Sequence, residues 1–291
     1  MALANPDLLA ADTAMGAVTL DVADLDVMTA YYRDAIALEV LSSAGTEVTL
    51  GRGADPVVIL RHSPELRAAS PGQAGLFHTA ILFETQAALA AVVATAAQYP
   101  GVKFVGSSDH LVSQAFYFDD PEGNGIELYW DRDRTEWSWT HGQVEMDTLF
   151  LDPNQFLRDH LSERGLDAPT TLGGATVGHV HLSVGDVGTA RSFYVDTLGF
   201  EATASFGSQA LFVSAGKYHH HMAMNVWNSR GAGRRQRTLG LGQVDIVVPT
   251  ADEVGALTER MKHFSVQTRD DGRTVSFDDP WANLINVRAA D

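Results

Sequence analysis

The chain has 291 residues, a formal net charge of −17 at neutral pH and no cysteine. That charge would repel a polyanion, so nucleic acid is not an expected partner. The lack of cysteine excludes disulfides and thiolate ligands, so any bound metal must use His and carboxylate side chains. There is no signal-peptide pattern and no apolar stretch of about 18 residues, so we expect a cytoplasmic protein with no membrane partner. Whether the chain forms a homo-oligomer stays open.

The first predicted elements are a strand and a helix over residues 20–39. Alternating apolar positions there pass through Asp into apolar residues at helical spacing. The same pattern recurs over 182–201 and aligns with the first copy without a gap. Residues 75–93 and 240–258 form a second matching pair, again with a strand that leads into a helix. The chain therefore repeats itself.

A third pair of similar segments lies at the C-terminal ends of two of the repeats. FDDPEGNGIELYW from Phe118 and FDDPWANLINVRA from Phe277 each join an Asp-Pro turn to an apolar run that is typical of a final strand. The patterns divide the chain into four modules of similar plan, residues 15–62, 75–135, 176–228 and 239–291. We expect a linker over 136–175 between two halves, 1–135 and 176–291.

These repeats resemble a known superfamily. The βαβββ plan, the helix ending FYVDTLGF and the DPEGNGIELY ending are similar to the vicinal oxygen chelate superfamily, which includes glyoxalase I, antibiotic-resistance proteins and extradiol dioxygenases. The resemblance covers nearly the whole chain. It implies an α+β fold in which paired modules form a curved sheet, and the first and last strands supply the ligands of a divalent metal. The chemistry must still be argued from the site, because one fold serves many functions.

The four modules differ at the superfamily's ligand positions. The first-strand position holds, in chain order, Ala17, His78, His179 and Gln243, and the last-strand position holds Glu127 in module two and Asn286 in module four. Two imidazoles and one carboxylate make the facial triad of non-haem Fe(II) oxygenases. This set is complete only if modules two and three pair. We therefore predict a metal held by His78, Glu127 and His179, with modules one and four paired separately.

The segment before Glu127, DHLVSQAFYFDDPEGNGIELYW, resembles the ring-cleavage dioxygenases more closely. His110 and Tyr117 fall on the His and Tyr of their pattern, although the His segment is shorter here by two residues. The resemblance implies that Fe(II), with Mn(II) as an alternative, binds a small aromatic diol such as a catechol, which O₂ then cleaves beside the diol. His would transfer protons, and Tyr would hydrogen-bond a substrate oxygen.

Module three contributes a run of histidines, in which alignment on Ala223 gives the proton-transfer role to His220. Strand alternation sends His220 to one face and its neighbours His219 and His221 to the other, so a shift of one residue reverses this choice. Further residues assigned to substrate contact are His181, His221 and Asn225. His181 follows the ligand position by two residues and should share its face, either lining the cavity or supporting a ligand.

Two other functions compete with ring cleavage. A glyoxalase-like isomerase or lyase would use Ni, Zn or Mn and usually has a fourth protein ligand. A drug-sequestering resistance protein would use the same cup without turnover. A single His on a strand is more often a core residue than a ligand, but three matches at equivalent repeat positions favour the triad.

Overall fold

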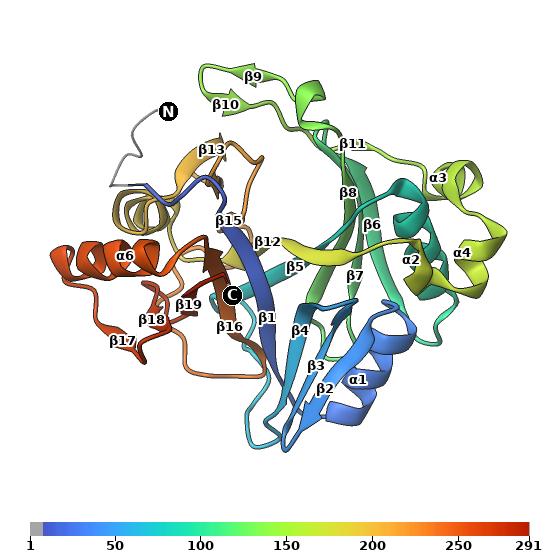
Figure 1. The fold of residues 1–291 in the computed structure, drawn as a ribbon, viewed down its shortest axis with the longest axis horizontal. Helices are drawn as coiled ribbons and strands as arrows, with labels where there is room; N and C mark the ends of the chain where they lie inside the picture. The colour runs from blue at the N-terminus through green and yellow to red at the C-terminus, as the bar shows by residue number, and fades with distance from the viewer. Residues whose placement is uncertain (1–7, 291) are drawn as a thin grey trace.

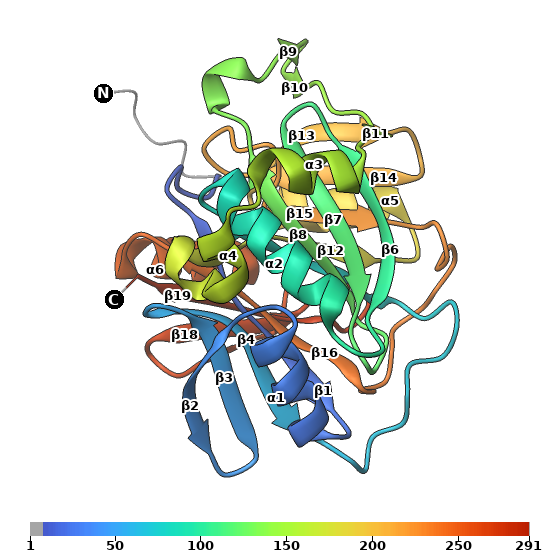
Figure 2. The same cartoon turned by 90° about the vertical axis from the view of Figure 1, so that its right-hand side faces the viewer.

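The computed structural model describes residues 8–290, which form two large mixed β-sheets with helices on their outer sides and one small two-stranded sheet (Figures 1 and 2). One hydrophobic core joins the two sheets, and it includes Leu20 and Val244 from one sheet and Ile81 and Val180 from the other. Because these side chains are almost completely buried, they stabilise the packing of the sheets against each other.

The first sheet combines modules one and four. Its strands, in spatial order, are β17 (Thr268–Asp270), β18 (Thr274–Asp278), β19 (Leu284–Ala289), β16 (Gly240–Val248), β1 (Ala14–Val22), β4 (Asp55–His62), β3 (Glu47–Arg52) and β2 (Glu39–Ala44). The two modules meet where β1 pairs antiparallel with β16.

The second sheet combines modules two and three. Its strands, in spatial order, are β11 (Leu149–Phe150), β6 (Lys103–Asp109), β7 (Ser113–Asp119), β8 (Gly125–Asp131), β5 (Gly75–Phe83), β12 (Ala175–Ser183), β15 (Met222–Asn225), β14 (Ala210–Ser214) and β13 (Glu201–Phe206). The modules meet where β5 pairs antiparallel with β12. The crossed pairing of modules and the α+β fold predicted from the sequence are therefore confirmed.

The first strand of every module leads into a helix through the same capping interaction. The side chains of Asp24, Thr85, Asp186 and Thr250 each accept a hydrogen bond from the backbone N–H three residues later. The helices that follow are α1 (Leu25–Asp34), α2 (Gln86–Gln98), α5 (Val187–Arg191), which continues as the π-helical turn η3 (Ser192–Thr197), and α6 (Ala251–His263). Local cap chemistry thus sets the strand-then-helix plan.

Buried tyrosines tie modules that are neighbours in the chain. The hydroxyl of Tyr32 on α1 donates to Asp120 Oδ2 at 3.1 Å, and Tyr194 in η3 donates to Asp279 Oδ2 at 2.9 Å. Each Asp also accepts hydrogen bonds from backbone N–H groups of its own turn. The Asp120 turn precedes β8, so this contact helps to fix the strand that carries Glu127.

The segment between modules two and three is folded. It contains η1 (Arg134–Glu136), β9 (Trp139–Thr140), β10 (Gln143–Val144), β11 at the sheet edge, α3 (Pro153–His160), α4 (Glu163–Asp167) and η2 (Pro169–Leu172). Figure 2 shows α3 and α4 beside α2, on the outer side of the second sheet. The division into halves 1–135 and 176–291 stays a prediction. Within residues 8–290, no helix is long and apolar enough to cross a membrane.

Candidate metal centre and active site

The predicted ligands come from three neighbouring strands, β8, β5 and β12. Ala80 on the central strand pairs with a ligand residue on each side. Ala80 on β5 is opposite His179 on β12 at one side and opposite Glu127 on β8 at the other. His78 precedes Ala80 by two residues, so strand alternation places it on the same face. The face that carries the predicted ligands is therefore set by register.

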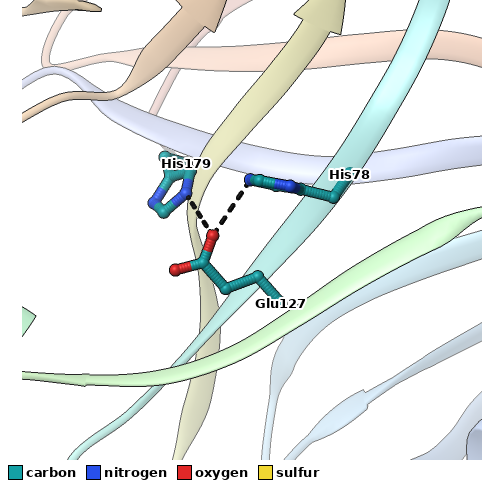
Figure 3. A group of neighbouring side chains, drawn as sticks. All are labelled: His78, Glu127 and His179. Carbon is teal, nitrogen blue, oxygen red and sulfur yellow. Dashed lines mark hydrogen bonds and ion pairs between the residues drawn. The ribbon is translucent and has the colours of Figure 1, made fainter. Parts of the chain in front are cut away.

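The three side chains converge on one point (Figure 3). Glu127 Oε2 lies 3.0 Å from His78 Nε2 and 3.1 Å from His179 Nε2. One ligand atom from each residue lies within 4.8 Å of the other two. The side chains come from three strands and are all buried, so the cluster is held rigidly.

The charges of the cluster suit a divalent cation. Burial lowers the pKa of His179 to about 4 in spite of Glu127 nearby, so its imidazole is neutral at pH 7. Burial raises the pKa of Glu127, but the contacts with His179 and His78 outweigh burial and hold that pKa well below its usual value. His78 Nε2 is buried and makes no hydrogen bond of good geometry. A metal ion would satisfy this nitrogen and compensate the buried carboxylate.

A cavity of about 400 Å³ opens onto the cluster. Besides the three predicted ligands, its lining includes His110, Tyr117, His181 and His220. Apolar side chains form most of the remaining wall. A ligand that entered this cavity would therefore meet the metal cluster and these four side chains within a largely apolar wall.

His110 and Tyr117 form a hydrogen-bonded pair in the cavity wall. His110 Nδ1 lies 2.7 Å from the carbonyl oxygen of Asp147 and must donate to it, because a carbonyl only accepts. With this hydrogen on Nδ1, the lone pair on Nε2 accepts a hydrogen bond from the Tyr117 hydroxyl over 2.7 Å. Burial and the charge of Glu127 raise the pKa of Tyr117 well above its ordinary value, so the hydroxyl stays protonated. Its oxygen remains able to accept from a substrate O–H.

His220 ends a buried chain of hydrogen bonds. Asp131 accepts from the Tyr218 hydroxyl at 2.7 Å and from His219 Nε2 at 2.9 Å. When His219 donates its Nε2–H to Asp131, the lone pair on its Nδ1, 2.7 Å from His220 Nδ1, accepts a hydrogen bond from the Nδ1–H of His220. His220 Nε2 is then the unprotonated nitrogen. Burial lowers the pKa of His220 well below its ordinary value, so this base is neutral at pH 7.

The remaining predicted residues occupy two different settings. His181 lines the cavity, and its Nε2 accepts from Asn225 Nδ2 at 3.0 Å; the Asn225 amide is oriented because its oxygen accepts from Trp227 N. His221 is buried outside the lining, where its Nδ1 lies 3.0 Å from Ser214 Oγ. Within residues 8–290 the lining includes neither His221 nor Asn225, so the structure places these two behind the cavity wall.

At the positions equivalent to the predicted metal ligands, the first sheet has one alanine and two side-chain amides. Ala17 on β1 has no donor atom, and Gln243 and Asn286 each donate a side-chain hydrogen bond at 3.1 Å to Asp245 Oδ1. Burial raises the pKa of Asp245. The only metal-binding group found among the described residues is the cluster of His78, Glu127 and His179 in the second sheet.

Several residues of this site gave no signal in the sequence. Met146, Asp147 and Thr148 line the cavity although they belong to the segment expected to be a linker. His219 was named in the sequence as part of the His run, but its partner Asp131, 88 residues earlier in the chain, meets it only in the folded structure.

Comparisons with known proteins identify the family of this chain. Residues 176–287 match the model of the Glyoxalase/Bleomycin resistance protein/Dioxygenase superfamily. The chain is also 32% identical, over 274 residues, to catechol-2,3-dioxygenase of Bacillus subtilis (strain 168), covering 92% of this chain and 94% of that relative. The chain therefore belongs to the Glyoxalase/Bleomycin resistance protein/Dioxygenase superfamily.

Solved structures show the same fold. A Bacillus subtilis protein proposed to be a dioxygenase gives a TM-score of 0.62 at 16% identity, covering 95% of this chain and 84% of that one. Glyoxalase I from Zea mays gives 0.58 at 14% identity, covering 96% and 92%. Because both activities occur on this fold, the fold alone does not select between them.

Proposed function

We propose that this protein is an extradiol dioxygenase that cleaves a catechol-type aromatic diol with O₂ at a non-haem Fe(II) centre. The observation that carries the proposal is the convergence of His78, Glu127 and His179 in one cavity, since two neutral imidazoles and a carboxylate form a facial triad with open positions. The 32% sequence identity to a catechol-2,3-dioxygenase, over most of both chains, supports the proposal. Mn(II) accepts the same donors and is the second candidate metal.

In this proposal the metal supplies binding positions for the diol oxygens and for O₂. The other roles belong to side chains of the chain itself. His220 takes a proton from the bound diol through its free Nε2, because its Nδ1 is occupied by His219. Tyr117, held by His110, accepts a hydrogen bond from a diol O–H and orients the ring. His181, fixed by Asn225, forms a polar part of the wall.

Apolar walls serve the chemistry by excluding water. Phe77, Val112 and Phe212 line the same cavity as the metal cluster. Exclusion of water strengthens the hydrogen bonds and charges inside the site and protects reactive species from side reactions. The enclosure therefore suits a reaction in which an aromatic ring is opened.

A glyoxalase-like isomerase is the main alternative, because glyoxalase I shares the fold. Such enzymes usually complete the metal site with a fourth protein ligand. Within the described chain, no fourth His or carboxylate joins the cluster of His78, Glu127 and His179. This ligand count favours the dioxygenase, which needs open positions for both diol and O₂.

The deciding experiment loads the purified protein with Fe(II) under anaerobic conditions and then adds catechol and air. We expect O₂ consumption and a ring-opened semialdehyde product in equal amounts, and neither in the Glu127→Gln variant. Isomerisation of a thiol hemiacetal by the Ni(II)- or Zn(II)-loaded protein, without O₂ uptake on catechols, would favour the alternative.

A further inference from the structure

Large hydrophobic side chains at the cavity are unusually exposed. Val105 on β6 is 64% exposed, Phe206 on β13 is 45% exposed, and Trp227 after β15 is 46% exposed, and all three line the cavity. Isolated exposed hydrophobic residues need no explanation, but several around one cavity mark a surface that a ligand covers. The part of the cavity open to solvent is thus suited to an apolar group.

These residues belong to two aromatic groups on the cavity wall. The ring of Trp227 lies edge-on to Phe77, with centroids 5.3 Å apart, and Phe206 lies edge-on to Phe212 at 5.4 Å. Both inner rings line the cavity as well. Packed rings of this kind give a ligand apolar surface and a defined shape at little entropic cost.

The charge of the lining points in the same direction. Among the described residues, the cavity wall includes the carboxylates of Asp119, Glu127 and Asp147 and no Lys or Arg. A divalent metal with one carboxylate and two neutral imidazoles has a net charge of +1, which a singly ionised diol already cancels. A further carboxylate on the substrate ring would find no cationic side chain in this wall to pair with. The net charge of the chain, −17, would also repel it.

We infer that the site selects catechols with uncharged, apolar ring substituents and discriminates against catechols that carry a carboxylate. The inference rests on the ring-cleaving function proposed above. The substituent would lie against Val105, Phe206 and Trp227, and the diol would lie at the metal cluster. The class of substrate is thus an alkyl- or aryl-substituted catechol.

The test compares two catechols of similar size, 4-propylcatechol and 3,4-dihydroxyphenylacetate, on the Fe(II)-loaded protein. The ratio of kcat/KM values should favour the propyl compound by about 100-fold, the scale expected when one charged group is left unpaired. Dissociation constants measured anaerobically by calorimetry should differ in the same direction. Equal kcat/KM values within about threefold would overturn the inference and leave the dioxygenase proposal intact. If neither compound were cleaved, the dioxygenase proposal would fail, and the two dissociation constants would still decide the preference.

A matched pair of variants tests the role of the wall. Phe206→Arg adds a cation to the cavity mouth, whereas Phe150→Arg makes the same change at an 87% exposed position of β11 outside the lining. Phe206→Arg should shift the kcat/KM ratio toward the acid by about 10-fold, and Phe150→Arg should leave it unchanged. An equal shift in both variants, or none in Phe206→Arg, would contradict the assignment of this wall to the substituent.

Discussion

Replacement of His220 by Ala tests the proposed proton-transfer residue. The side chain lines the cavity and hydrogen-bonds through Nδ1 to His219, and it is not part of the metal cluster. The variant should therefore keep its metal. Loss of a general base costs about 10² to 10⁴ in rate, or about 3 to 5 kcal/mol of activation free energy. We expect this loss in kcat as well as in kcat/KM, measured by O₂ uptake on a catechol at equal iron content.

His221→Ala is the matched control, because the two histidines are neighbours and are 8% and 7% exposed. His221 contacts Ser214 Oγ and Ala215 N behind the cavity wall. Its loss should lower the free energy of unfolding by about 1 to 3 kcal/mol and change kcat by less than about threefold. A silent His220→Ala combined with a large kcat loss in His221→Ala would refute the assignment. Loss of metal in both variants would instead place the run among the ligands and favour the glyoxalase-like function.

The remaining predictions concern the metal and one buried carboxyl. Glu127→Gln and His78→Ala should each lose metal retention and ring cleavage but keep the circular dichroism spectrum of the fold; full metal content in either variant would remove that residue from the site. The unmodified protein should hold one metal per chain, since Gln243 and Asn286 donate to Asp245 in the other sheet, and two equivalents by mass spectrometry would contradict this. Burial raises the pKa of Asp120 from 3.8 to about 6, so the folded state binds its proton more tightly than the unfolded state does. As the pH rises from 4 to 6, the free energy of unfolding of the unmodified protein should therefore fall by up to about 3 kcal/mol relative to that of Asp120→Asn. If urea titrations show the same difference between the two proteins at every pH, the raised pKa of Asp120 is disproved.

The repeats made much of this molecule predictable. Equivalent positions in the four modules identified His78, Glu127 and His179 before any fold was known, and their ligand count required the crossed pairing of modules that the two sheets show. The sequence also placed an Asp between the first strand and the helix of modules one and three, and in the structure Asp24 and Asp186 cap those two helices. These features are local or repeated, so a single sequence contains them.

Long-range contacts were not predictable in the same way. The contact of His219 with Asp131 depends on how the second sheet brings β8 near the turn before β15, and the approach of Met146 to the cavity depends on how the connecting segment packs. No periodic pattern records such packing. The sequence predicted that strand alternation separates His220 from its neighbours, but β15 begins only at Met222. Residues 219–221 lie before the strand, so alternation does not apply to them and could not fix where His221 lies.

The central claim is most directly tested by measuring O₂ consumption and iron content together. The Fe(II)-loaded protein should contain one iron per chain and consume one O₂ for each catechol converted to a ring-opened semialdehyde. Loss of His179 or Glu127 should abolish the iron content and the O₂ consumption together. Stoichiometric iron without any O₂ uptake across a panel of alkyl catechols, or cleavage that persists in iron-free protein, would contradict the account.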